Sequence, residues 1–136
     1  DLVNHLQLSA LWQLLHGTPA AALALAEQGA HMAQAVPFPL QGLSCALLAV
    51  SARMLLGESD AIADSLHAAL AQARRIGSQG YLMNALFLEA AWQRRQGDPT
   101  CARAALAEAE SIAHTCGVLR VRKIPPLLLN EARAAP

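Results

Sequence analysis

The sequence is short of aromatic, charged and cysteine residues, and each shortage excludes a class of protein. Aromatic residues make up 4% of the 136 residues, charged residues make up 15%, and the formal net charge is zero. A neutral chain has no overall attraction to nucleic acid or anionic lipid. Its three cysteines, Cys45, Cys101 and Cys116, form no CxxC pair. This argues against a disulfide framework or a zinc site and favours a reducing, cytoplasmic location. No apolar run reaches the roughly 20 residues of a membrane-spanning helix.

Strand-like alternation of apolar and polar residues is absent as well, so we predict an all-α fold. Hydrophobic residues still make up 54% of the chain, and alanine supplies much of that share, as expected where helices approach closely. The apolar spacing and the intervening turn residues predict helices over residues 2–16, 19–35, 40–56, 59–76, 78–96 and 99–115.

The first predicted helix carries apolar residues on two sides. Leu6 and Trp12 lie along one side, and Leu8 and Leu11 lie along another. A surface helix keeps one polar face, so we expect this helix to pack on both sides. Because the chain also begins without Met, we expect the sequence to be part of a longer protein.

Three glycines, Gly17, Gly57 and Gly97, are spaced 40 residues apart. Gly97 is expected to end one helix in the left-handed conformation, while Asp98 caps the next helix and Pro99 fits its first turn. The same arrangement is expected at residues 17–19 and, without the proline, at residues 57–60. A pair of antiparallel helices in each unit cannot bury its apolar faces alone, so the units stack into a superhelix.

We therefore predict a single helical-repeat domain over residues 1–136. Its repeat units are approximately 1–36, 40–76 and 78–117, followed by an irregular tail with a C-terminal helix at 118–136. In that tail, Pro125 and Pro126 are expected to kink or end the helix that would open a fourth unit.

The residues around these turns resemble the tetratricopeptide-repeat family. That motif places Gly at the inter-helix turn, then Ala, a large apolar residue and Ala, and Gly97, Ala102, Leu106 and Ala109 match all four. The period exceeds the roughly 34 residues of the family and is similar to that of the repeats in large bacterial ATP-dependent LuxR-type regulators. The resemblance implies a right-handed superhelix, an α-solenoid of about three repeats. This sequence contains neither the phosphate-binding loop nor the DNA-reading segment of such regulators.

In tetratricopeptide arrays the first helix of each pair lines a concave groove in which peptides usually bind. The groove positions carried over by offset from the glycines are Asn4, Gln7, Leu11, Ser44, Leu47, Ser51, Asn84, Phe87, Ala91 and Arg94. Arg95 lies beside the last of these and is added to the candidates. The set lacks the basic cluster that holds a C-terminal carboxylate, so that ligand is not predicted. The alternative is that several of these residues only pack.

Arg94 and Arg95 replace apolar residues of the other units, and two interpretations remain open. A cation in the last turn of a helix is stabilised by the macrodipole by roughly 0.3–1 kcal/mol. The alternative is that the pair binds an anion or an acidic peptide. Trp12 and Trp92 share one register two units apart, and we expect both to pack in the core or between repeats.

No catalytic or metal-binding pattern occurs in the sequence. His5 and His16 are about 16 Å apart on one helix, and no HExxH, paired-cysteine or glycine-rich phosphate motif is present. Asp60 and Asp64 are expected to oppose a helix dipole. The basic residues at 120–123 lack the interleaved aromatics of a nucleic-acid site. We therefore predict no enzyme activity, no metal and no cofactor.

Two functions follow from these observations. The first is a regulatory module that binds a peptide, a partner protein or a small inducer on its concave face and couples that binding to a neighbouring ATPase or DNA-binding module. Direct binding of membrane or nucleic acid by this segment is not expected. The second is a self-assembly scaffold that forms a homodimer through the apolar first helix.

Overall fold

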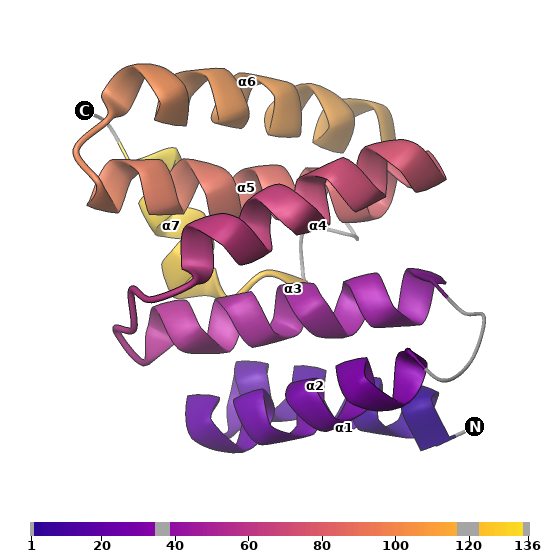
Figure 1. Cartoon of the computed structure of the whole chain (residues 1–136). Helices are drawn as coiled ribbons and strands as arrows, with labels where there is room; N and C mark the ends of the chain where they lie inside the picture. Colours follow the sequence, from indigo (N-terminus) through magenta and orange to yellow (C-terminus); the bar gives the residue numbers. More distant parts are fainter. Residues whose placement is uncertain (1, 35–38, 117–122, 135–136) are drawn as a thin grey trace. The chain divides into compact units, whose positions relative to one another are not determined.

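The computed structural model describes residues 2–34, 39–116 and 123–134, and the regular elements in these ranges are all helices (Figure 1). The predicted all-α class is therefore confirmed. The ends of the six helices predicted from the sequence lie within three residues of the observed ends. The helices are α1 (Leu2–His16), α2 (Pro19–Ala33), α3 (Pro39–Leu55), α4 (Ile62–Ile76), α5 (Gln79–Arg95), α6 (Pro99–Cys116) and α7 (Pro126–Arg133).

Polar side chains cap three of these helices. The Thr18 hydroxyl accepts a hydrogen bond from the N–H of Ala21 at 3.3 Å, and the Ser78 hydroxyl accepts one from Tyr81 at 3.4 Å. Asp98 accepts a bond from the N–H of Cys101 at 3.0 Å. Each bond satisfies a first-turn donor that has no partner within its helix. The caps expected at Thr18 and Asp98 are confirmed.

The glycine turns agree with the prediction at two of the three spaced positions. Gly57 and Gly97 have φ angles of 76° and 77°, whereas Gly17 is not left-handed. After Gly97, the N–H of Asp98 bonds to the backbone carbonyl of Gln93 at 2.9 Å. After Gly17, the side-chain oxygen of Gln13 accepts a hydrogen bond from the N–H of Thr18 at 3.4 Å. Because a side chain satisfies that donor, the left-handed closure expected at Gly17 does not form.

The connection before α4 is longer than predicted. The helix begins at Ile62 rather than near residue 59, and Ala61 adopts a positive φ of 62°. Asp60 therefore lies in the turn, outside the helix, while Asp64 lies in its first turn. The expectation that both carboxylates share the start of one helix was wrong for Asp60, because the left-handed turn at Ala61 delays the helix.

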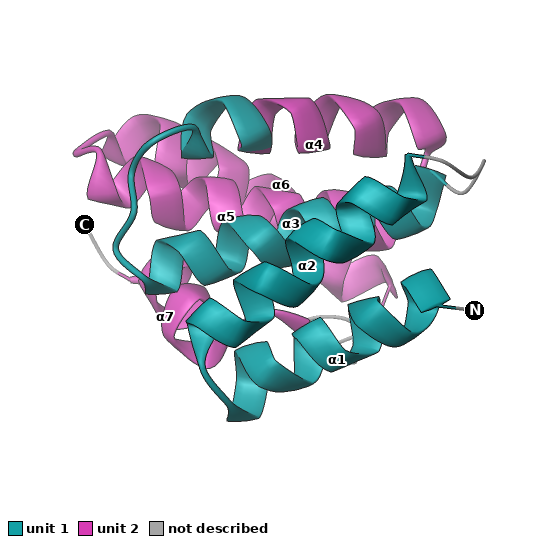
Figure 2. Ribbon diagram, turned by 60° about the horizontal axis from the view of Figure 1, so that its bottom comes forward, with its two compact units in different colours: residues 1–65 teal, residues 66–136 magenta. Residues whose placement is uncertain are grey.

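Contacts along the chain divide it into two compact units, residues 1–65 and 66–136, with the division inside α4 (Figure 2). The unit at 1–65, called unit 1, contains α1, α2, α3 and the first residues of α4. The unit at 66–136, called unit 2, contains the rest of α4 with α5, α6 and α7.

Small residues let the helices of unit 1 approach closely. A Cβ atom added at Gly29 of α2 would lie 2.8 Å from the sulfur of Cys45 on α3 and 3.5 Å from the Cβ of Leu6 on α1. The three helices therefore meet where only glycine fits. The core cluster beside this contact is mostly alanine: Ala10, Leu14, Ala22, Ala26, Leu48, Ala49 and Ala52.

In unit 2, α5 is buried on nearly every side, and Met83, Phe87 and Leu88 are its largest fully buried side chains. Helix α6 packs beside it through alanines such as Ala102 and Ala109. Helix α5 thus forms the centre of this unit.

The two prolines of the tail begin a helix, a role that was not predicted for them from the sequence. Pro125 lies at the N-cap and Pro126 is the first residue of α7. A proline is tolerated there because its missing N–H would have no partner in the first turn. Leu128 and Ala132 of α7 are fully buried. Helix α7 packs mainly against α5 and less against α6, whereas α3 packs mainly against α2 and less against α1.

Candidate binding surfaces

Two groove candidates of unit 2, Phe87 and Arg94, contact α7. Phe87 and Ala91 are fully buried, and Asn84 is nine-tenths buried with no hydrogen-bond partner for its Oδ1. Arg94 donates from its Nε to the carbonyl oxygen of Ala132, at 3.0 Å. That carbonyl lies in the last turn of α7, where carbonyls lack intrahelical partners. The sequence placed Arg94 and Phe87 on a binding face, and α7 of the same chain lies on it.

Arg95 makes a second contact with α7. Its Nε and Nη2 atoms bind the two carboxylate oxygens of Glu131 at 2.6 and 2.9 Å. Two parallel N–H···O bonds fix orientation as well as distance. Neither interpretation of the arginine pair included this role, because the partner residues lie 36 to 38 positions away in the sequence.

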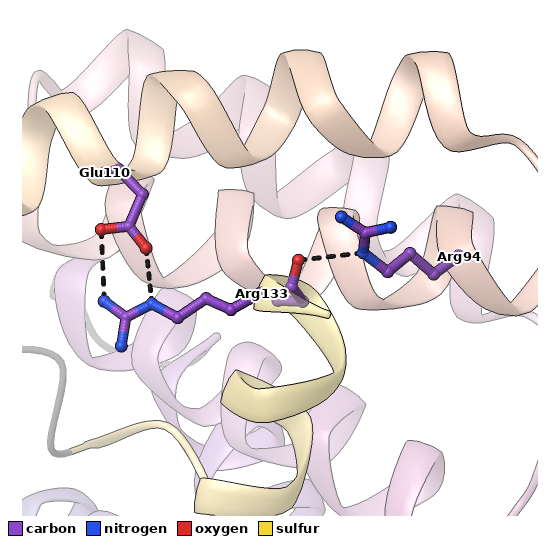
Figure 3. A network of polar contacts seen from close by, with 4 residues as sticks. Arg94, Glu110 and Arg133 are labelled. Carbon is purple, nitrogen blue, oxygen red and sulfur yellow. Dashed lines mark hydrogen bonds and ion pairs between the residues drawn. The ribbon is translucent and has the colours of Figure 1, made fainter. Parts of the chain in front are cut away.

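Arg133 ties the end of α7 to α6 (Figure 3). Its guanidinium binds both carboxylate oxygens of Glu110, with the second contact at 3.2 Å. The same guanidinium lies 5.2 Å from the centroid of the Phe87 ring, a cation–π distance. Charge and aromatic contacts therefore act together at the C-terminal end of α7. The run Glu131-Ala132-Arg133 was not recognised from the sequence.

The groove candidates of unit 1 differ in exposure. Ser44, Leu47 and Ser51 on α3 are buried. On α1, Asn4 is exposed, while Gln7 and Leu11 are half-buried. Of the predicted groove positions in unit 1, those on α1 are therefore accessible to a ligand and those on α3 are not.

A cavity of about 270 Å³ opens in unit 1 between α2 and α3. Glu27 and Arg53 form an ion pair on its wall, with Arg53 Nη2 at 2.6 Å from Glu27 Oε1. Alanines form its apolar lining, and the full set of lining residues is Glu27, Ala30, His31, Gln34, Ala46, Ala49, Arg53 and Ser65. No pattern considered in the sequence pointed to this cavity, because its two walls come from separate helices.

One side of α1 exposes large apolar residues. Leu8 is 57% exposed and Trp12 is 59% exposed. The expected packing role holds for Trp92, which is buried, but not for Trp12, whose ring lies 5.6 Å from that of His16. The expectation that Leu6 and Trp12 share one side of the helix was wrong, because Leu6 is buried with Ala10 and Leu14 on the side opposite Trp12. The side that carries Leu8 and Trp12 is exposed, contrary to the expectation that this helix packs on both sides.

Ionisable groups elsewhere in the described residues form structural contacts. Arg74 of α4 binds both carboxylate oxygens of Glu108 on α6 at 2.9 Å. Burial raises the pKa of the Cys45 thiol, and the hydrogen bond with Asp98 raises the pKa of the Cys101 thiol. Both shifts disfavour the reactive thiolate.

Metal-binding groups of three or more side chains do not occur among the described residues, and the basic residues Arg120 and Arg122 lie outside them. None of the helices in the described ranges is long and apolar enough to cross a membrane. Comparison with protein-family models, with curated proteins and with solved structures found no match to this chain.

Proposed function

We propose that this chain is a tetratricopeptide-like helical-repeat module of a larger, cytoplasmic bacterial signalling or transcriptional regulator, in which it binds a peptide, a partner protein or a small inducer. One observation carries the proposal. The α5 face that the repeat register assigns to ligand binding holds a helical segment, α7, through Phe87, Arg94 and Arg95. A face with these contacts has the chemistry to hold a helix of another protein.

The polar contacts that hold α7 are weak enough for a helix of another protein to replace α7. The side chains of Arg95 and Glu131 are 26% and 27% exposed, and those of Arg133 and Glu110 are 41% and 42% exposed. Ion pairs near solvent contribute only about 0–1 kcal/mol each. Helices shorter than roughly 12 residues are marginal in water on their own, and α7 has 8 residues. A partner helix that makes the same contacts and buries more apolar surface would therefore shift the population toward a state with α7 displaced.

Selection of displayed helical peptides against the whole immobilised chain tests this proposal. We expect the enriched peptides to carry an acidic residue two positions before a basic one, with an apolar residue one turn earlier, as in α7. Their binding should be lost in Arg95→Met and kept in Arg75→Met. Arg75 is the matched control because it also ends a helix and is exposed. No enrichment, or equal binding to both variants, would count against the proposal.

Self-assembly through α1 is the second candidate function, and the exposure of Leu8 and Trp12 favours it. Sedimentation analysis should then give a dimer that dissociates when Leu8 and Leu11 are both changed to Gln. The control variant is Leu127→Gln, which removes a leucine that is 64% exposed on α7. A monomer at high protein concentration would exclude this function for α1.

A further inference from the structure

The ion pair on the wall of the unit 1 cavity is less complete than the other arginine–glutamate pairs in the described residues. Arg74, Arg95 and Arg133 each make two N–O contacts with their glutamate partners. Arg53 makes one contact with Glu27, from Nη2 to Oε1. Guanidinium N–H donors and one carboxylate oxygen are therefore left to bind another molecule at this place.

Helix geometry sets the length of the cavity. Its α2 wall runs from Glu27 to Gln34, and its α3 wall runs from Arg53 back to Ala46. Seven residues of helix rise about 10 Å. Because Glu27 pairs with Arg53, the ion pair lies at one end of both walls, and Gln34 and Ala46 lie toward the other.

The lining between these ends is small and apolar. Ala30, Ala46 and Ala49 extend no further than Cβ, so the space between the helices stays open. At about 270 Å³, the volume is below the roughly 300–1,000 Å³ of pockets that hold drug-sized molecules. The occupant is therefore small.

We propose that this cavity binds a small zwitterion of the α-amino-acid class. The carboxylate of the ligand accepts hydrogen bonds from the open guanidinium N–H groups of Arg53, and its ammonium group donates to the open oxygen of Glu27. A ligand with a single charge satisfies only one of these two groups and is repelled by the other. The ligand side chain extends over the alanines toward His31 and Gln34. This inference uses residues of unit 1 alone and does not depend on the α5 face.

Titration of the isotope-labelled whole chain, followed by NMR, tests the proposal with glycine, L-alanine and L-glutamine as probes. Propionate and propylamine are the single-charge controls. We expect the zwitterions to shift the amide signals of Ala30, Ala46 and Ala49, and the single-charge compounds to leave them unchanged.

Two variants address the contacts directly. Arg53→Met should weaken binding at least tenfold, the change expected for loss of a charge-assisted hydrogen bond, whereas Arg75→Met should leave it unchanged. Ala46→Leu should also abolish binding by filling the cavity, and because Ala46 is only half-buried the fold should tolerate the change.

Three results would overturn the proposal. The first is no shift with any zwitterion at about 10 mM, a concentration at which a ligand with a Kd of about 1 mM fills roughly nine-tenths of the sites. The second is equal shifts with propionate or propylamine, and the third is unchanged binding by Arg53→Met. Failure of the peptide selection against the α5 face would leave this proposal standing, and the reverse also holds.

Discussion

Replacement of Gly29 by alanine tests how closely the helices of unit 1 pack. The new Cβ would lie 2.8 Å from the Cys45 sulfur, a separation that Cβ atoms essentially never show. Cys45 is fully buried, so its sulfur has little space to move. The Cβ of Leu6 lies 3.5 Å from the added Cβ and limits movement of the new methyl group away from the sulfur. The helices must therefore separate or the cysteine must leave its preferred rotamer.

The size of the effect follows from two opposing terms. Overpacking of a close contact costs about 1–3 kcal/mol, while alanine in place of glycine inside a helix gains about 1 kcal/mol. We expect Gly29→Ala to lower the free energy of unfolding by about 0–2 kcal/mol.

Gly42→Ala is the matched control, because Gly42 also lies in a helix of unit 1 and its added Cβ would meet only the Cβ of Ala33, at an ordinary 3.5 Å. Gly42→Ala should stabilise the protein by up to about 1 kcal/mol. The difference between the two variants isolates the steric term, and urea unfolding followed by circular dichroism measures it from the shift in midpoint. Adding Cys45→Ala to Gly29→Ala removes the colliding sulfur and should recover part of the loss. Equal stabilisation by the two glycine replacements would refute the close packing of α2 on α3.

Three further predictions concern a turn, a cap and the ion pair that holds α7. Gly97→Ala should lower the free energy of unfolding by about 1–2 kcal/mol, because its φ of 77° is left-handed, whereas Gly42→Ala, whose added Cβ makes only an ordinary contact, should not; equal urea midpoints for the two variants would contradict this. Hydrogen bonds from Cys101, first from its backbone N–H, hold the pKa of Asp98 below its ordinary value. At a pH above the ordinary pKa of aspartate, Asp98 therefore stabilises the fold, and this stabilisation is lost as the pH falls through the lowered pKa. The thermal midpoint of the wild type should exceed that of Asp98→Asn at neutral pH, and the difference should disappear in acid. A difference that stays constant with pH would argue against the cap. Glu131→Gln should speed hydrogen exchange in α7 more than in α6, and uniform exchange would show that Glu131 does not hold α7.

The helices and most of their caps could be predicted because they depend on local patterns. Glycine, proline and a short polar residue close together specify a turn and a cap, so the caps at Thr18 and Asp98 were found. Two exceptions arose where a single residue changed the local structure. Gln13 supplied an acceptor that removed the need for a left-handed Gly17, and Ala61 adopted a conformation that alanine rarely takes.

For each candidate surface, the sequence could predict one of the two residues in a contact but not its partner. Comparison between units singled out Arg94 and Arg95 as unusual, yet their acceptors belong to a helix that the sequence left irregular. Which acidic residue meets which arginine depends on the docking of α7, and no local pattern encodes it. The cavity of unit 1 has the same property, because Glu27 and Arg53 are 26 residues apart.

The different exposure of the two tryptophans makes intrinsic fluorescence report mainly on one of the two units. Trp12 belongs to unit 1 and is already exposed, whereas Trp92 belongs to unit 2 and is buried. Unfolding transfers only the Trp92 indole from an apolar environment into water. The shift of intrinsic fluorescence therefore records the loss of unit 2, while the circular dichroism of the helices records both units. Any separation between the two unfolding curves measures how far the halves of this chain fold independently.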